Sequence, residues 1–381
     1  MMTDKLKFVI PLIVCSIFCF SCGTAKTTTE TAHSETQMNL EYAEQFSVYS
    51  LDDGSYEINI TDGQKFLLVP EGTAEPQTDS DVTVIHQPVQ NLYVAASSSM
   101  DLFDGIGVLD EVKMTSTKLS DWSLPAVQNA LESGSMTYVG KYSTPDYETV
   151  ISENCGLALE STMIYHSPET KEQLESLGIP VMVERSSYES HPLGRLEWIK
   201  LYGLIMGREK EAEDFFNEKM KIFGEVSANT DIPENERHTV AFFYITANGY
   251  ANVRKPDDYI SKMIDLAGGR YIFTGDDLNT EENALSTMNM DIESFYQKAK
   301  DADFIIYNST IDGELENISQ LIEKNELLSD FRAVKNNNVW CTEKNTFQQT
   351  TGVSEMIHDI HMIVTGQADD MEQLEFLHRL S

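Results

Sequence analysis

A loop just before a long helical stretch concentrates the side chains best suited to gripping a ligand. The segment ERSSYESHPLGRLEW contains Arg185, Tyr188, His191 and Arg195. A guanidinium group forks onto carboxylate, catecholate or phosphate oxygens, and a tyrosine ring stacks on a planar ligand or hydrogen-bonds to it. Arg185 and Tyr188 are therefore the leading ligand contacts. Arg195 could instead pair with Glu197 or Glu189, and capping or packing is the favoured role of His191.

Aromatic and basic residues in other expected loops form a second set of candidates. They are Tyr142, Tyr244, Tyr250 and Arg254. Aromatic walls suit flat and bulky metal chelates, although each of these side chains could equally belong to the core. Trp122 and Trp198 have lower priority, because a tryptophan near helical sequence packs more often than it binds.

The loops that follow expected strands are the places to search for further contacts. Ligands of open α/β sheets bind outside the carboxyl ends of the strands. In the first half of the chain these loops cover residues 97–100, 140–145, 160–162 and 185–191. In the second half they cover residues 247–254, 308–310 and 344–349.

Motifs of catalysis and of direct metal capture are missing from the sequence. It contains no G-x-S-x-G elbow, no H-E-x-x-H motif and no Walker-type phosphate loop. His358 and His361 share a helix face, but a zinc site needs three or four convergent ligands. We therefore expect no catalytic residue, no metal ligand and no cofactor. A hydrolase remains an alternative, because a carboxylate pair could hide among the 62 acidic residues.

The N-terminus has the pattern of an export signal. Two lysines precede an apolar run over residues 8–20, which is too short to cross a membrane, so residues 1–21 are expected to be a signal peptide. The cleavage region resembles a bacterial lipobox, in which Cys22 would become the lipidated first residue. Cys19 stands where the lipobox usually has leucine, so ordinary cleavage nearby or a retained anchor helix stays open.

The residues after Cys22 predict a tether on a strongly acidic body. Residues 22–40 are expected to be the lipidated cysteine and a flexible tether, because residues 24–37 are rich in threonine and glutamate and cannot bury enough apolar surface to fold. The formal net charge of -35 makes nucleic acid a poor partner and opposes contact with an anionic membrane surface. The body should therefore meet the membrane only through its lipid, on the outer side of the cytoplasmic membrane. Cys155 and Cys341 remain in the body, and their pairing is not deducible.

Hydrophobic patterning divides the folded body into a leader and two similar halves. Residues 41–76 read as a β-hairpin leader, since Tyr56, Ile58 and Ile60 alternate with polar residues before a turn. Residues 77–190 and 227–381 each alternate short apolar runs with helical stretches, which predicts βα units on a mainly parallel sheet. The fold class is thus α/β, with two Rossmann-like lobes.

A single long helix is expected to join these lobes. Apolar residues keep helical spacing over residues 191–226, and Pro192 suits the first turn. About 30 helical residues would span about 45 Å, which is enough to form a strut between two lobes. The ligand cleft should lie between the lobes, and the strut should allow only small rearrangement on binding.

Several segments in this order resemble one family of binding proteins. They are VGKYSTPDYETVISENCGLALE, LESLGIPVMV, GREKEAEDFF, DLAGG, DIESFYQKAKDADFIIYN and AVKNNNVW. Together they are similar to substrate-binding proteins of iron-siderophore, heme and corrinoid ABC importers, the class with one interdomain helix. The resemblance covers residues 82 to the C-terminus.

The resemblance implies a docking role for two glutamates. The family uses one glutamate on each lobe to meet arginines of the permease, and the matching positions are Glu148 and Glu293. A carboxylate near a helix start is also favoured by the helix dipole, so support of the helix is the alternative role.

The function that the resemblance implies is capture of a small metal-chelate ligand and its delivery to an ABC permease with its ATPase. A ferric siderophore is the favoured ligand, with heme or a corrinoid next, and the protein is expected to be a monomer. A lipid-anchored hydrolase and a sensory or scaffold protein on the same fold are the alternatives.

Overall fold

The computed structural model describes residues 36–230, 232–275 and 286–381 of the chain. These residues belong to one compact unit that extends from Glu35 to Ser381. The expected signal peptide, Cys22 and the tether up to residue 35 lie outside the described residues. Among the described helices, none combines the length and the apolar character that crossing a membrane would require.

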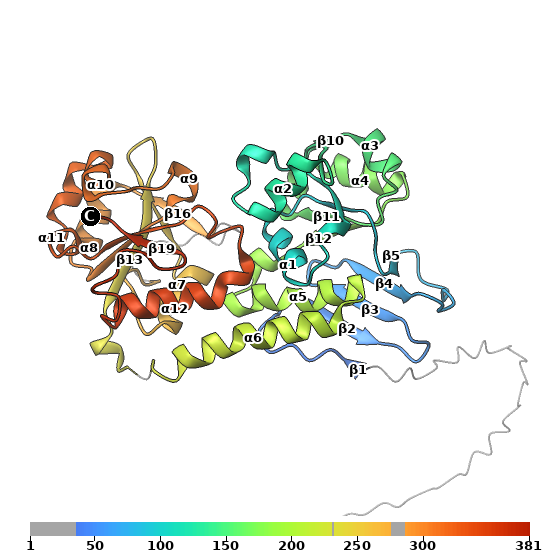
Figure 1. Cartoon of the computed structure of the whole chain (residues 1–381), viewed down its shortest axis with the longest axis horizontal. Coiled ribbons are helices and arrows are strands. Elements are labelled where there is room, and N and C mark those ends of the chain that lie inside the picture. Colours follow the sequence, from blue (N-terminus) through green and yellow to red (C-terminus); the bar gives the residue numbers. More distant parts are fainter. Residues whose placement is uncertain (1–35, 231, 276–285) are drawn as a thin grey trace, which may run out of the picture. The chain divides into compact units, whose positions relative to one another are not determined.

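A five-stranded leader sheet precedes the lobes, and its strands are hydrogen-bonded in sequence order (Figure 1). It contains β1 (Thr36–Gln37), β2 (Phe46–Ser50), β3 (Tyr56–Ile60), β4 (Lys65–Pro70) and β5 (Val82–Gln87). β2, β3 and β4 run antiparallel, as the alternation around Ile58 predicts, whereas β5 pairs with β4 in parallel. Because of this pairing β5 belongs to the leader, so the first lobe begins later than the expected residue 77.

Two glutamates hold the chain that enters the leader sheet. Glu197 is 0% exposed and accepts hydrogen bonds from the backbone N–H groups of residues 41–43 at 2.8 to 3.0 Å. Glu189 accepts from the N–H groups of residues 44 and 45 at 2.8 and 3.0 Å and from the Trp198 indole at 2.8 Å. We call these two carboxylates and the backbone they bind the leader anchor.

The first lobe is built on a parallel sheet, as expected. Its strand order is β12-β11-β6-β7-β8, and every pair is parallel. The strands are β6 (Leu92–Val94), β7 (Val112–Thr115), β8 (Thr137–Tyr138), β11 (Ala158–Ser161) and β12 (Val181–Glu184), with β9 (Gly140–Lys141) and β10 (Thr144–Pro145) as a separate hairpin. The helices are α1 (Met100–Gly105), α2 (Pro125–Ser133), α3 (Tyr147–Ser152) and α4 (Pro168–Ser176).

The second lobe has a seven-stranded mixed sheet. β13 (Thr239–Ile245), β17 (Phe304–Tyr307) and β18 (Val339–Thr342) form its parallel centre, to which β15 (Arg270–Tyr271) adds in parallel. β14 (Ala251–Arg254), β16 (Thr287–Met290) and β19 (Leu377–Arg379) add antiparallel edges. The helices are α7 (Tyr259–Leu266), α8 (Ile292–Ala299), α9 (Ser309–Asp312), α10 (Ile318–Lys324), α11 (Arg332–Lys335) and α12 (Val353–Val364).

The prediction of one continuous helix over residues 191–226 is wrong. The stretch forms α5 (Pro192–Met206) and α6 (Glu209–Ser227), which lie side by side (Figure 1). Gly207 ends α5 with φ of 64°, a left-handed conformation that side chains disfavour, and the next N–H group bonds back to the Gly203 carbonyl at 2.7 Å. Gly203 then permits close packing, since a Cβ there would lie 2.4 Å from that of Ala212.

After this break, α6 contacts both lobes. Its 19 residues span about 28 Å, less than the expected strut. Phe215 contacts Gly105 of the first lobe, and Lys219 forms an ion pair with Glu355 of α12 in the second. Every residue of α5 is buried, so this helix acts as part of the core beneath the lobes.

Candidate functional site

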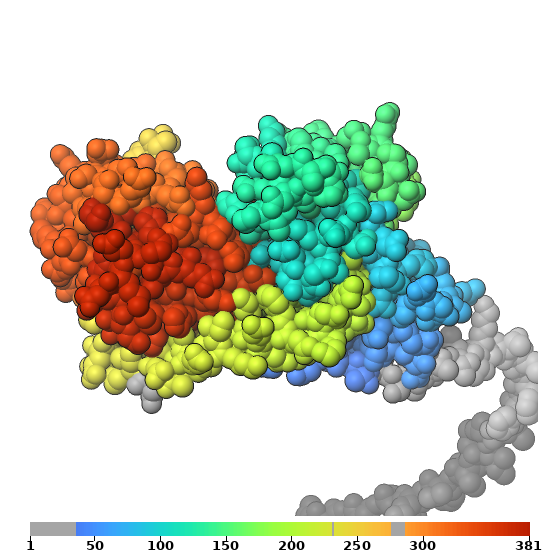
Figure 2. All heavy atoms as spheres, viewed as in Figure 1, coloured from blue at the N-terminus to red at the C-terminus, as the bar shows by residue number. Residues whose placement is uncertain are grey.

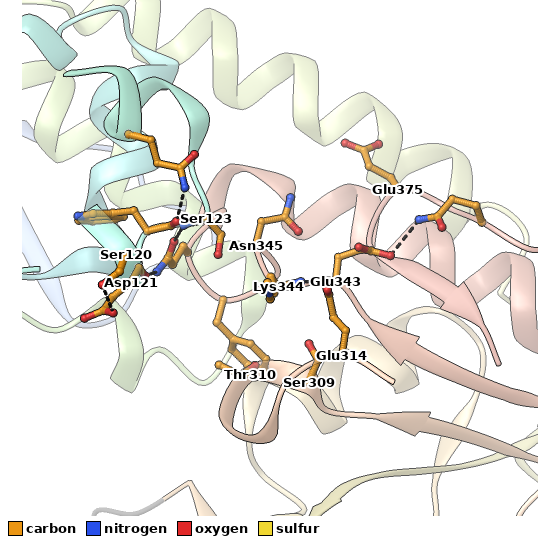
Figure 3. Close-up of a pocket in the computed structure, with 16 residues that line it drawn as sticks. Ser120, Asp121, Ser123, Ser309, Thr310, Glu314, Glu343, Lys344, Asn345 and Glu375 are labelled. Atoms are coloured by element: carbon orange, nitrogen blue, oxygen red, sulfur yellow. Dashed lines mark hydrogen bonds between the residues drawn. The ribbon is translucent and has the colours of Figure 1, made fainter. Parts of the chain in front are cut away.

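A cleft of about 660 Å³ lies between the two lobes. Residues 120–123 and Gln128 line it from the first lobe, and residues from 309 to 375 line it from the second (Figure 3). The surface is hollowed between the blue-green first lobe and the orange-red second lobe (Figure 2). The cleft adjoins the carboxyl ends of β17 and β18, where α/β sheets bind ligands.

Hydrogen bonds from the second lobe to the first form one end of this cleft. The Gln348 side chain accepts from the Ser123 N–H at 2.7 Å and donates to the Asp121 carbonyl at 2.8 Å. Thr351, three residues after Gln348, donates a hydrogen bond from its N–H group to the Asp101 carboxylate of the first lobe at 2.8 Å. These contacts fix the loop after β18 to the first lobe, so the lobes are joined here as well as through α6.

Carboxylates dominate the charged groups of the cleft. Its charged lining residues are Asp121, Glu314, Glu343, Glu375 and Lys344. Amides and hydroxyls supply most of the remaining polar groups, at Ser120, Ser123, Gln128, Ser309, Thr310, Asn345, Gln348 and Gln373. Trp122 and Phe347 supply aromatic surface. The Oδ1 atom of Asn345 is buried and has no hydrogen-bond partner among the described residues.

A histidine behind the cleft orients one of these carboxylates. His378 of β19 places Nδ1 2.7 Å from Glu343 Oε1 and Nε2 2.7 Å from the Leu315 carbonyl. Both partners are acceptors, so both ring nitrogens donate and the ring is an imidazolium. The Cys341 sulfur, the Leu315 carbonyl and Glu343 raise the pKa of His378 to about 10, against the effect of burial.

The two leading candidates of the sequence lie against the leader sheet instead of in this cleft. The Arg185 guanidinium stacks 4.4 Å above the Tyr188 ring centre, and its Nε donates to Gln45 Oε1 at 3.1 Å. The physical reason is the position of β12, the edge strand that precedes Arg185. Gln64 of the leader bonds to the backbone of Val183 in this strand, so the following loop faces the leader.

The secondary candidates are spread over both lobes, and none is among the residues that line the cleft. Tyr142 lies in the turn between β9 and β10, Tyr244 on β13, and Tyr250, 46% exposed, in the hairpin after it. Arg254 comes nearest, since its guanidinium lies 5.1 Å from the ring centre of Phe347. Arg254 therefore contacts the cleft-lining residue Phe347 but is not itself part of the lining.

Arg195 also lies outside the cleft lining. Its guanidinium stacks 4.2 Å from the ring centre of Tyr259, and the glutamates with which it could pair belong to the leader anchor. His191 caps α5, where its Nδ1 accepts from the Leu193 N–H at 3.2 Å, and its ring stacks on Tyr42. The capping and packing role favoured for His191 is confirmed.

The second-lobe wall of the cleft is formed by loops that follow predicted strands. The expected loops 308–310 and 344–349 both contribute to the cleft. The first-lobe wall was missed, because β7 did not stand out as a strand and Trp122 was assigned to packing. The alternating apolar residues Val112 and Met114 were the signal for that strand.

The two body cysteines are free thiols, which settles the pairing that the sequence left open. Burial raises the pKa of Cys155 to about 11, so this thiol stays protonated at neutral pH. No group of histidine, cysteine, aspartate or glutamate residues suited to hold a metal ion occurs in the described ranges. His361 packs instead, with Nδ1 3.0 Å from the Ala267 carbonyl.

Glu148 and Glu293 occupy equivalent places on the two lobes. Each is exposed in the first turn of a helix, α3 or α8. Asp146 caps the first helix by accepting from the N–H groups of residues 148 and 149, and Asp291 caps the second by accepting from Ser294. Because aspartates perform the capping, neither glutamate is needed for it.

This chain belongs to the periplasmic binding protein family, whose sequence profile matches residues 94–346. The match bears out the resemblance to this family. Two relatives are described as uncharacterized lipoproteins of Methanocaldococcus jannaschii. They are 28% and 26% identical, over 87% and 81% of this chain and 81% and 79% of theirs.

Solved structures show the same fold at low sequence identity. A periplasmic heme-binding protein of Vibrio cholerae aligns with a TM-score of 0.57 and 18% identity, over 73% of this chain and 98% of its own. The catecholate-siderophore binding protein of the same organism aligns at 0.56 and 15%, over 72% and 94%. Its vitamin B12 binding protein aligns at 0.51 and 13%, over 73% and 97%.

Proposed function

We propose that this chain is an extracytoplasmic solute-binding lipoprotein, which captures a metal-chelate ligand in the cleft between its lobes and delivers it to an ABC permease. The observation that carries the proposal is the cleft of about 660 Å³ at the carboxyl ends of β17 and β18, with walls from both lobes. Such a volume suits a ligand of the size of a metal chelate.

The ligand is a ferric siderophore, heme or a corrinoid. The names of similar proteins support these three classes. The resemblance favours a ferric siderophore, but Arg185 and Tyr188, the leading candidate contacts, stack on each other outside the cleft lining. The residues that line the cleft are therefore the ones that distinguish among the three ligand classes.

Capture by this cleft requires no reaction. Binding and release depend only on affinity differences between the free and the permease-bound protein. The hydrogen bonds of Gln348 and Thr351 join the lobes beside α6, so we expect little closure when a ligand binds. A large compaction in solution scattering would contradict this expectation.

The docking surface comprises Glu148 and Glu293. Neither carboxylate has a hydrogen bond or an ion pair within the described part of the chain, and both are exposed. Replacing either with lysine should abolish uptake and leave ligand affinity unchanged, because the cleft lies elsewhere. Glu153→Lys at the opposite end of α3 is the matched control and should leave uptake intact. A loss of affinity in the lysine variants would contradict the docking role.

Lipid attachment at Cys22 holds the body at the membrane. The description of two relatives as lipoproteins supports this attachment. Cys22 and the tether up to residue 35 lie outside the described residues.

A ligand panel tests the proposed function. Residues 35–381 form one compact unit, so this body can be examined by thermal shift and by tryptophan fluorescence with ferric siderophores, heme and cobalamins. Saturable binding of an unchanged ligand supports capture. Saturable binding by no member would overturn the ligand assignment, and chemical turnover of a member would favour the hydrolase.

A further inference from the structure

The charge of the cleft restricts which chelate it can accept. Four carboxylates and one lysine line it, and no arginine is among its described lining residues. The walls are otherwise amides, hydroxyls and the rings of Trp122 and Phe347. A ligand that presents carboxylate or catecholate oxygens would meet repulsion, with only Lys344 to oppose it.

The internal partners of these carboxylates leave most of their charge in place. Glu343 is balanced by the His378 imidazolium. Glu314 accepts a hydrogen bond from the backbone N–H of Lys344 at 2.7 Å, and Asp121 accepts one from the Ser120 hydroxyl at 2.9 Å. These two donors are neutral, so they orient the carboxylates without cancelling their charge.

Burial is the main reason that the charged form of Glu375 is disfavoured. Burial and then the nearby Glu355 raise the pKa of Glu375, while Lys219 and His358 lower it. Glu355 lies outside the cleft lining, and a cation in the cleft would favour the charged form of Glu375.

The nearby arginines are held away from the cleft. Arg254 lies 3.6 Å from Asp258 and stacks behind Phe347, and Arg195 stacks on Tyr259. Arg185 faces the leader sheet. An anionic ligand in the cleft would therefore lack the forked guanidinium contact that carboxylate and catecholate oxygens favour.

We propose that the cleft selects a metal chelate of net positive charge and discriminates against polyanionic chelates. This inference rests on the proposed function, because it concerns the ligand of the same cleft. The carboxylates of Glu314, Asp121 and Glu375 provide the attraction.

The test compares chelates that differ mainly in charge. One series is a ferric trihydroxamate with a pendant amine that is free, acetylated or succinylated. The other compares aquacobalamin with cyanocobalamin, and heme and a ferric tricatecholate serve as anions. In whichever series binds, we expect the protein's affinity for the cationic member to exceed its affinity for the neutral member by roughly threefold to tenfold. The difference should shrink when salt is raised from about 0.05 to about 0.5 M.

The opposite order would overturn the inference. Equal or tighter binding of neutral or succinylated members, or saturable binding of heme or the tricatecholate alone, refutes charge selection but leaves the proposed function standing. Saturable binding by no chelate overturns both. The two failures are thus distinguishable.

A charge-removing variant tests the same point at one residue. Glu314→Gln retains an oxygen for the Lys344 N–H group, so the local fold should persist. This variant should lower the affinity for the cationic chelate by roughly threefold to tenfold and leave the affinity for the neutral member unchanged. Glu316→Gln, an exposed residue outside the cleft lining, is the matched control and should change neither affinity. Equal effects of the two variants would contradict the inference.

Discussion

Two acidic regions of this protein use carboxylates in opposite ways. In the leader anchor, Glu197 receives the backbone N–H groups of residues 41–43 together with the Lys200 ammonium at 2.9 Å. In the cleft, Glu314 receives one N–H group and faces open volume. The Glu197 carboxylate is therefore saturated by internal donors and structural, whereas the Glu314 carboxylate has spare acceptor capacity beside the cleft and is available to a ligand.

The two regions also differ in what surrounds the charge. The leader anchor is enclosed, so each donor lost there would leave a buried charge without compensation. The cleft carboxylates are partly or fully exposed to solvent, so their charge is tolerated in the free protein. Variants that remove one carboxylate at a time can separate these roles.

The largest effect is expected at the leader anchor. Glu197→Ala should lower the free energy of unfolding by about 3–5 kcal/mol, because three N–H groups and an ammonium lose their buried partner. Urea denaturation measures this change, and ligand affinity per folded molecule should stay the same. Glu213→Ala, which removes the exposed partner of Lys200 at 3.6 Å, is the matched control and should cost less than about 1 kcal/mol. Similar losses of unfolding free energy in both variants would contradict the structural role of Glu197.

Glu160 is buried like Glu197, but neither of its carboxylate oxygens has a hydrogen-bond partner within the described residues. Burial raises the pKa of Glu160 from 4.5 to about 8. The folded state therefore holds this proton more tightly than the unfolded state, and stability is lost as pH rises between these values.

Glu160→Gln should accordingly match the original protein near pH 5 and exceed it in stability by a few kcal/mol above about pH 8. Urea denaturation at the two pH values measures the difference. A constant difference between the two proteins across this range would show that Glu160 does not titrate there.

A smaller effect is expected at His378, which links the fold to the cleft. His378→Gln should cost about 2 kcal/mol of stability near neutral pH, because a charge-assisted bond to Glu343 is lost. The pKa of His378 is raised from 6.5 to about 10, so its contribution is complete below 6.5 and disappears as pH rises toward 10.

The variant should therefore converge with the original protein in stability at about pH 10, as thermal unfolding over a pH series can show. It should also change ligand affinity, since Glu343 loses its orientation in the cleft. If the variant loses stability but keeps its ligand affinity, Glu343 has a structural role like that of Glu197 and does not contribute to ligand binding.

Much of the architecture could be predicted from the sequence, for physical reasons that act over short distances. Alternation around Ile58 indicated the leader strands, and buried apolar runs indicated the parallel centre of each lobe. The break at Gly207 was missed because apolar residues keep helical spacing on both sides of it. One glycine with positive φ outweighs that periodicity.

The site was harder to predict, because it depends on which loops meet in space. Arg185 has suitable chemistry but follows an edge strand that faces the leader sheet. Trp122 resembled a core residue, and it is buried, yet it also lines the cleft. Residue type suggested ligand contacts, whereas strand order determined which side chains reach the cleft.

The most direct test of the account is ligand affinity after the cleft is filled. Thr310 is exposed and lines the cleft, whereas its neighbour Ile311 is 70% exposed and lies outside the lining. The measurement is a calorimetric titration of Thr310→Trp and Ile311→Trp with the chelate that binds the original protein. We predict that Thr310→Trp weakens binding at least about tenfold and that Ile311→Trp does not. Equal affinities for the two variants would contradict the assignment of the cleft as the ligand site.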